Sequence, residues 1–229
     1  MDTNIGAKER VTQNRLIGLF KNVLKYTCLG NWETREGNAN IEETLLTAYL
    51  SRRGYTDKEI RSAIAKFKQA ANSLGGGLYN ANKEVYTLLR YGVNVQAEVT
   101  EKKKMVHLID WANPMENDFQ IAEEVTIQGE SDRRPDLVVY VNGIALAVIE
   151  LKRSTVSAHE GIRQNIRNQQ DGYIPRFFTT IQLLFAGNDT EGLHYGVIKT
   201  PEKFWLRWKE PCGEPCKPSR FTAEEYPNE

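Results

Sequence analysis

The sequence lacks the features that would tie a chain together covalently or place it in a membrane. It has three cysteines, Cys28, Cys212 and Cys216, which are too few for a disulfide framework and indicate a reducing compartment. Cys212 and Cys216 lie in Pro-Cys-Gly-Glu-Pro-Cys without a second pair, so a zinc site there is not favoured. The chain shows no signal-peptide pattern and no apolar run of about 20 residues, and we expect a cytoplasmic protein without a membrane partner.

The sequence also lacks net charge. Thirty basic residues cancel thirty acidic ones among 229, so no global positive field points to nucleic acid, although local patches decide phosphate contacts. Hydrophobic residues make up 40% and charged residues 26%, as in ordinary soluble domains. A core can therefore form without disulfides or structural metals.

Helical patterns dominate the first 92 residues. Residues 1–30 fit either a short helix or a strand, and the sequence leaves this open. Apolar spacing of three and four predicts helices over three later segments: 41–50, capped by Asn38 or Asn40; 56–72, opened by Thr56 and ended by the glycines at 75–77; and 80–91, ended by Gly92.

Strand patterns follow. They predict strands within 93–99, 106–109, 118–127, 136–141, 144–152 and 177–186, with a helix over 155–170. This order predicts an α/β fold with a mixed central β-sheet flanked by helices. We expect one domain over residues 1–210, with an N-terminal helical elaboration and a core at about 90–200, and a loosely held tail over 211–229.

The clearest local signal is a hairpin with charged residues at its open end. Two β-rich runs are joined by Asn142-Gly143, a strong turn signature. Asp136 begins the first run, and Glu150 and Lys152 end the second on one face, because side chains alternate. Two carboxylates with the Leu151 carbonyl could hold a divalent cation, and the lysine could position water or stabilise charge. The alternative is that these charged strand ends simply meet solvent.

The register of this hairpin decides whether such a site can form. A two-residue loop would pair Val141 with Ile144 and place Asp136 opposite Ile149, facing away from Glu150. A type I turn with a G1 bulge would pair Tyr140 with Ile144 and bring the acids to one face. We predict the bulged turn, with Gly143 at positive φ; a bend elsewhere in the first strand would serve as well.

These residues carry a resemblance to a known family. Arg134-Pro135-Asp136 followed by Ile-Glu-Leu-Lys over 149–152 resembles the PD-(D/E)xK nuclease motif. More narrowly, most of 10–210 resembles the N-terminal nuclease domain of the restriction (R, motor) subunit of type I restriction-modification enzymes. Supporting stretches are Leu89–Val93, Leu108–Pro114, Asn117–Phe119, Glu160–Asn165 and Ala186–Gly192.

The resemblance implies a restriction-endonuclease-like fold and DNA cleavage that requires Mg²⁺, with Mn²⁺ as a possible substitute. Asp136 and Glu150, with the Leu151 carbonyl, would then bind the metal, and Lys152 would be the catalytic lysine. A glutamate from the first helix, for which Glu43 is the first choice and Glu42 the second, would assist them.

A Gln-x-x-x-Tyr element is also expected after the lysine. Its literal match is Gln169 to Tyr173, whereas the distance from Lys152 favours Gln164, whose fourth residue on is Asn168; both options stay open. The arginines around the motif could contact phosphates or simply be solvated: Arg133, Arg134, Arg153, Arg163 and Arg167.

The family's ATP-driven translocase is not recognisable here, because no Gly-x-x-x-x-Gly-Lys-Ser/Thr sequence is present. We therefore expect a fragment, with ATP used only in a missing motor region and 211–229 starting a linker to it. Expected partners are double-stranded DNA and the methyltransferase and specificity subunits. The alternatives are another PD-(D/E)xK nuclease, or a catalytically silent DNA-binding or assembly module on the same fold.

Overall fold

The structure, a computed structural model, describes residues 5–96 and 102–209, with side chains from residue 10 onward. The expected tail over 211–229, Cys212, Cys216 and the last part of the strand expected over 93–99, residues 97–99, lie outside the described residues. Among the described residues, nine strands form a seven-stranded sheet in the order β1-β4-β5-β6-β7-β8-β9 and a separate β2-β3 pair. The strands are β1 (Thr27–Asn31), β2 (Val93–Val95), β3 (Lys104–Val106), β4 (Phe119–Glu123), β5 (Leu137–Val141), β6 (Ile144–Leu151), β7 (Leu183–Asn188), β8 (Gly192–Gly196) and β9 (Leu206–Arg207).

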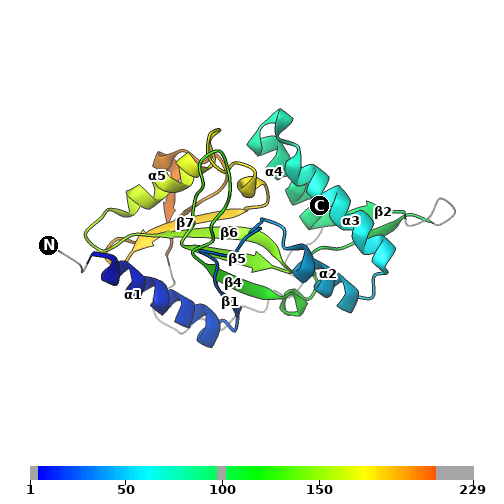
Figure 1. Cartoon of the computed structure of the whole chain (residues 1–229), viewed down its shortest axis with the longest axis horizontal. Coiled ribbons are helices and arrows are strands. Elements are labelled where there is room, and N and C mark those ends of the chain that lie inside the picture. The colour runs from blue at the N-terminus through cyan, green and yellow to red at the C-terminus, as the bar shows by residue number, and fades with distance from the viewer. Residues whose placement is uncertain (1–4, 97–101, 210–229) are drawn as a thin grey trace.

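Helices cover both faces and one end of the sheet. Figure 1 shows α1 and α5 on opposite sides of the sheet and α2, α3 and α4 grouped at one end. The α-helices are α1 (Ile5–Gly18), α2 (Glu43–Arg52), α3 (Asp57–Asn72), α4 (Leu78–Tyr91) and α5 (Ala158–Asn168). A π-helical turn, η1 (Leu19–Val23), and four 3₁₀ turns, η2 (Leu74–Gly76), η3 (Pro114–Glu116), η4 (Phe177–Thr179) and η5 (Glu202–Phe204), complete the described elements. Within these residues no helix is both long and apolar enough to cross a membrane.

The predicted fold class is confirmed. The pairs β1-β4 and β6-β7 are parallel and the other neighbours in the large sheet are antiparallel, so the sheet is mixed and flanked by helices. Apolar side chains fill three clusters. The α5 face buries Val138, Val148 and Ile162. The α1 face buries Leu137 and Ile149. A third cluster joins helices α2, α3 and α4, together called the α2–α4 lobe, to Ile144 at the start of β6.

Several predicted boundaries are confirmed and others are wrong. Thr56 and Glu59 form the capping box that opens α3. Helix α2 begins at Glu43, so the N-cap position belongs to Glu42, without a side-chain cap hydrogen bond, and not to Asn38 or Asn40. The amides of these two asparagines bind backbone carbonyls elsewhere. The ambiguous segment 1–30 contains both a helix and a strand, in that order.

The strand predicted over 177–186 begins only at Leu183. Its first residues, Phe177–Thr179, form the 3₁₀ turn η4, because an apolar run has the same composition in a buried turn as in a strand. The short strands β8 and β9 were not predicted.

The β5-β6 turn differs from the predicted one. Asn142 and Gly143 both have positive φ, 54° and 80°, and Val141 pairs with Ile144, so the loop has two residues. The G1-bulge prediction is therefore wrong, although the positive φ of Gly143 is confirmed. The register shifts further along: Tyr140 pairs with Ala145 but Val139 pairs with Ala147, which leaves Leu146 as an extra residue in β6. This bulge lies in the second strand, not the first.

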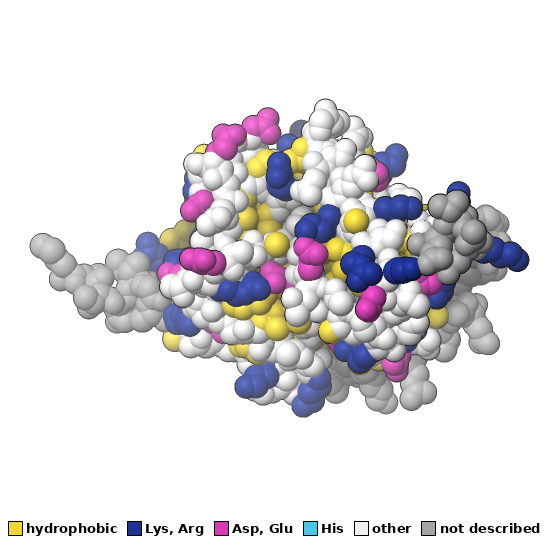
Figure 2. All heavy atoms as spheres, turned by 45° about the vertical axis from the view of Figure 1, so that its right-hand side comes forward, with side chains coloured by type: hydrophobic (Ala, Val, Ile, Leu, Met, Phe, Trp, Pro, Cys, Tyr) yellow, Lys and Arg dark blue, Asp and Glu magenta, His cyan; other side chains and the backbone are white. Residues whose placement is uncertain are grey.

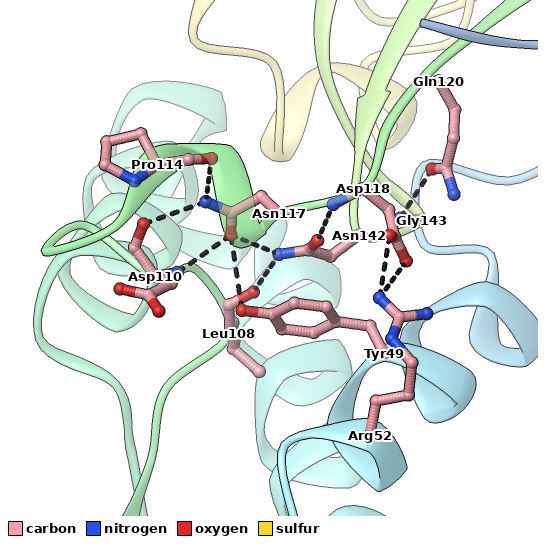
Figure 3. Close-up of polar contacts among 10 residues, drawn as sticks. All are labelled: Tyr49, Arg52, Leu108, Asp110, Pro114, Asn117, Asp118, Gln120, Asn142 and Gly143. Carbon is pink, nitrogen blue, oxygen red and sulfur yellow. Dashed lines mark hydrogen bonds and ion pairs between the residues drawn. The ribbon is translucent and has the colours of Figure 1, made fainter. Parts of the chain in front are cut away.

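A buried polar network holds the turn (Figure 3). The Asn142 amide donates to the Leu108 carbonyl at 2.9 Å and to Asn117 Oδ1 at 2.8 Å, and its oxygen accepts from the Asp118 N–H at 2.7 Å. Gly143 packs so closely on α2 that an added Cβ would lie 2.6 Å from Leu45 Cβ. The hydrogen bonds of the Asn142 side chain and the absence of a side chain at Gly143 together fix where the hairpin meets the α2–α4 lobe.

Replacing Asn142 by alanine should lower the free energy of unfolding by about 2–4 kcal/mol. The change leaves buried donors and acceptors without partners. It also places alanine, which tolerates a positive φ less well than asparagine does, in the turn. Urea unfolding followed by circular dichroism measures the effect. Asn94→Ala, at an exposed strand position, is the matched control and should change stability by less than about 0.5 kcal/mol. Equal stability of the two variants would contradict a bracing role for Asn142.

Candidate active site

Asp136 and Glu150 meet at the open end of the β5-β6 hairpin. Leu137 pairs with Ile149 beyond the bulge, so the residues next in line, Asp136 and Glu150, lie opposite each other and share a face. The Leu151 N–H donates to Asp136 Oδ2 at 2.6 Å, which holds the Asp136 carboxylate against the Glu150–Leu151 peptide. The extra residue Leu146 thus brings together two acids that the two-residue turn alone would separate.

Helix α5 covers Glu150. The Glu150 side chain is fully buried, and Gln164 Nε2 donates to its Oε2 at 2.7 Å. Gly161, one turn earlier, permits this approach, because a Cβ there would lie 3.1 Å from Ala186 Cβ and 3.5 Å from Glu150 Cβ. A carboxylate in this position is held in one orientation by a neutral amide.

The two candidate glutamines have different surroundings. Gln164 contacts the predicted site, whereas Gln169 donates to the Asn165 carbonyl and accepts from the Lys199 N–H, two contacts that tie backbone segments together. Tyr173 lies beyond the end of α5, with the Arg133 guanidinium 4.3 Å from its ring centroid. The structure therefore brings Gln164, and not the literal Gln-x-x-x-Tyr match, to Glu150.

Lys152 directly follows β6. Its N–H donates to the Gly187 carbonyl at 2.9 Å, so the ladder with β7 continues to this residue and alternation places its side chain on the Glu150 face. The side chain is half-buried. Asp136, just before β5, Glu150 of β6 and Gln164 of α5 thus meet at one place, and alternation assigns Lys152 to the same face.

The two glutamates proposed from the first predicted helix lie elsewhere. Glu42 donates its N–H to the Gly143 carbonyl at the turn. Glu150 lies six residues further along β6 than Ile144, the first residue after this turn, which is a distance of about 20 Å. Its carboxylate is bound by both terminal nitrogens of Arg35. Glu43 is exposed and ion-paired with Lys68. A glutamate that caps α2 cannot reach the open end of the hairpin, so neither joins Asp136 and Glu150.

The candidate phosphate-binding arginines are partly engaged with acids. Arg134 pairs with Glu33 and Glu124, and Arg163 pairs with Glu160 and Glu202. Arg133 stacks on a tyrosine ring, as described above. Arg153 is half-buried just after Lys152, and Arg167 is exposed in the last turn of α5.

Charge on the face drawn in Figure 2 is mixed, with Lys and Arg side chains interspersed among Asp and Glu. This pattern agrees with the absence of net charge in the sequence. On that face, phosphate contacts would have to come from individual cations and not from a broad basic surface.

The donor set suits a hard divalent cation. Among the described residues no group of three or more His, Cys, Asp or Glu side chains could hold a metal. Two carboxylates with a backbone carbonyl still match the sites that Mg²⁺ occupies, since Mg²⁺ keeps several waters and often takes only one or two carboxylates. Asp136, Glu150 and the Leu151 carbonyl fit this description.

Sequence reasoning missed two residues that shape the site. Gly161 has no polar group and no special φ, so no motif search would select it. Glu124, with a left-handed φ of 49°, donates its N–H to the Asp136 carbonyl at 2.8 Å and holds Arg134 and Arg10 with its carboxylate. Glu124 therefore fixes the backbone from which Asp136 projects.

Comparisons with known proteins show the family to which the chain belongs. Residues 7–203 match the family model of the type I restriction enzyme R protein N terminus. A protein of Methanocaldococcus jannaschii named as type I restriction enzyme MjaIXP endonuclease subunit is 29% identical over 154 residues, which are 64% of this chain and 14% of that protein. A type I restriction enzyme endonuclease subunit of Staphylococcus saprophyticus is 30% identical over 133 residues, 58% of this chain and 13% of that protein.

The chain thus corresponds to about one-seventh of the curated relatives it matches. The family model covers nearly all of the described residues, including β5, β6 and α5. The hairpin acids and the helix above them therefore lie inside the matched region, and the chain belongs to the family defined by the N terminus of the type I restriction enzyme R protein.

Proposed function

We propose that this chain is a Mg²⁺-dependent DNA endonuclease domain of a type I restriction enzyme. The observation that carries the proposal is the convergence of Asp136 and Glu150 on one face, with Gln164 bound to Glu150. Family membership and the names of the relatives, which are endonuclease subunits, support the same reaction class. Phosphodiester hydrolysis at paired carboxylates requires a cation to offset charge on the phosphate oxygens.

Each residue has a role in this proposal. Asp136, Glu150 and the Leu151 carbonyl would hold Mg²⁺, for which Mn²⁺ could substitute, and the metal would supply Lewis-acid polarisation of the scissile phosphate and its attacking water. Lys152 orients that water or offsets the charge that develops on the phosphate. Gln164 is a positioning residue, because it acts through Glu150.

The wider context is also part of the proposal. We propose that this domain acts on double-stranded DNA in the cytoplasm, together with an ATP-driven translocase and with methyltransferase and specificity subunits. The names of the much longer relatives, which are type I restriction enzyme endonuclease subunits, support a multi-subunit context. Arg133, Arg134, Arg153, Arg163 and Arg167 are the candidate phosphate contacts, of which Arg153 and Arg167 are the first to test.

Removing either carboxylate should strongly weaken metal binding. Asp136→Ala and Glu150→Ala should each weaken Mn²⁺ affinity at least about 100-fold, because a hard cation then loses one of its few protein ligands. Electron paramagnetic resonance of free Mn²⁺ measures this without any need for translocation. Magnesium-dependent nicking of supercoiled plasmid should be lost in both variants and in Lys152→Ala, while DNA binding in EDTA persists.

Glu43→Gln is the matched control, since that glutamate lies at the far end of the hairpin. It should bind Mn²⁺ and nick DNA as the unaltered chain does. Binding of Mn²⁺ by Glu150→Ala at unaltered affinity would overturn the metal site. A wild-type chain that binds DNA but neither Mn²⁺ nor Mg²⁺ would instead support a silent binding module.

Replacing Gln164 and replacing Gln169 should affect different properties, Mn²⁺ affinity in the first case and stability in the second. Gln164→Ala should weaken Mn²⁺ affinity by about 10- to 100-fold, as loss of a partner behind a metal ligand typically does, with little change in stability. Gln169→Ala should lower the free energy of unfolding by about 1–3 kcal/mol, because it leaves buried backbone groups without partners. Mn²⁺ titration and urea unfolding of both variants check this, and equal Mn²⁺ affinity of the two would refute the role assigned to Gln164.

A further inference from the structure

A second site-like feature lies at the other end of the hairpin, in the α2–α4 lobe. A pocket of about 470 Å³ opens between the C-terminal ends of α2 and α4 and the loop after β3. Its size falls in the range of small-ligand sites. Its walls are mainly aromatic and cationic: Tyr49, Tyr55, His107 and Trp111, with Arg53 and Arg90. Nothing in the carboxylate site requires these residues.

The mouth of the pocket carries an aromatic plane held in place beside a cation. Trp111 is 47% exposed, yet its indole N–H donates to the Leu89 carbonyl at 2.8 Å, so the ring orientation is fixed. The Arg90 guanidinium carbon lies 5.7 Å from the Trp111 ring centroid and 5.9 Å from that of Tyr91. Within the described part of the chain no ion pair engages Arg90, so its guanidinium can bind an anion.

The floor of the pocket is rigid. Asp110 is held by Arg53 at 2.8 Å and accepts from the Asn113 N–H at 2.9 Å. Its own N–H donates to Asn117 Oδ1, which also accepts from the Tyr49 hydroxyl at 3.3 Å (Figure 3). Burial raises the pKa of Tyr49, and its hydroxyl is the donor in this contact.

The charges of the pocket favour an anionic ligand. Asp110 is neutralised by Arg53, and Arg90 then supplies one net positive charge at the mouth. A fixed aromatic ring next to a guanidinium that no described acid engages is the arrangement that binds nucleotides without base selection, with the base stacked on the ring and the phosphate on the cation.

We propose that this pocket binds a single nucleotide, with its base stacked on Trp111 and its phosphate on Arg90. The shared chemistry is a nucleobase joined to a phosphate, whether in an unpaired DNA strand or in a free mononucleotide. The base of a paired duplex cannot enter, because it is stacked on both sides. The pocket lies at the turn end of the hairpin, and the length of β6 from Ile144 to Glu150, about 20 Å, separates that end from the carboxylate pair. The pocket is therefore distinct from the proposed cleavage site.

Binding of an oligothymidylate of about 12 nucleotides tests the proposal, measured by fluorescence anisotropy in EDTA with the 229-residue chain. Arg90→Met and Trp111→Ala should each weaken binding about tenfold or more, as expected from the loss of one stacked base or its phosphate contact. Arg90→Met is the variant less able to disturb folding, since Arg90 is exposed and in no described ion pair.

Lys83→Met is the matched control. It removes one exposed cation from the same helix about 10 Å away, outside the pocket, and should change the affinity by less than about twofold. Titration with free dTMP separates the two sources: competition at concentrations comparable to the oligonucleotide indicates a free-nucleotide site, and its absence indicates a strand site. Both support the pocket.

Two results would overturn the proposal. One is equal oligothymidylate affinity of Arg90→Met and Lys83→Met. The other is an equal loss of affinity for duplex and single-stranded DNA in Arg90→Met, which would indicate a general electrostatic contact. Because the assay contains no divalent metal, its outcome is independent of the proposed cleavage activity. Repeating it with Glu150→Ala keeps the two proposals separate.

Discussion

The candidate active site depends on the register of one β-hairpin. Side chains alternate along a strand, so an odd shift moves every residue of β5 to the opposite face relative to β6. The two-residue turn at Asn142-Gly143 sets a register in which Asp136 would face α1 while Glu150 faces α5. The single extra residue, Leu146, corrects this by one position. A β-bulge of this kind aims a side chain and is a built feature of the fold.

The conformation of the Asn142-Gly143 turn depends on the α2–α4 lobe. Asn142 is buried and bound by Asn117 and the Leu108 carbonyl, and Gly143 lies against the start of α2. Both residues take left-handed conformations that asparagine and glycine tolerate best. The lobe therefore stabilises the closed end of the hairpin, while α5 and Glu124 position its open end. The two ends of one hairpin are fixed by different parts of the chain.

The sequence predicted the features that come from local pattern. Four of the helices (α2, α3, α4 and α5), the main strands and the pair of acids could be read from periodicity and from the Asn-Gly signal, because these depend on neighbouring residues. Long-range packing could not be read. The position of the bulge, the choice between Gln164 and Gln169, and the remoteness of Glu43 all depend on how α2 and α5 pack on β6. Alternation alone required some irregularity in the hairpin but could not say that Leu146, in the second strand, would supply it.

Gly161 shows how far an active site can depend on a residue with no functional group. Helix α5 lies close to β6 at Gly161, where an added Cβ would lie 3.1 Å from Ala186 Cβ, tighter than an ordinary contact. A glutamine side chain is short, so it can touch a buried carboxylate only from a helix seated at that depth. A larger residue at position 161 can therefore disturb the contact between Gln164 and Glu150, although every charged residue of the site is still in place.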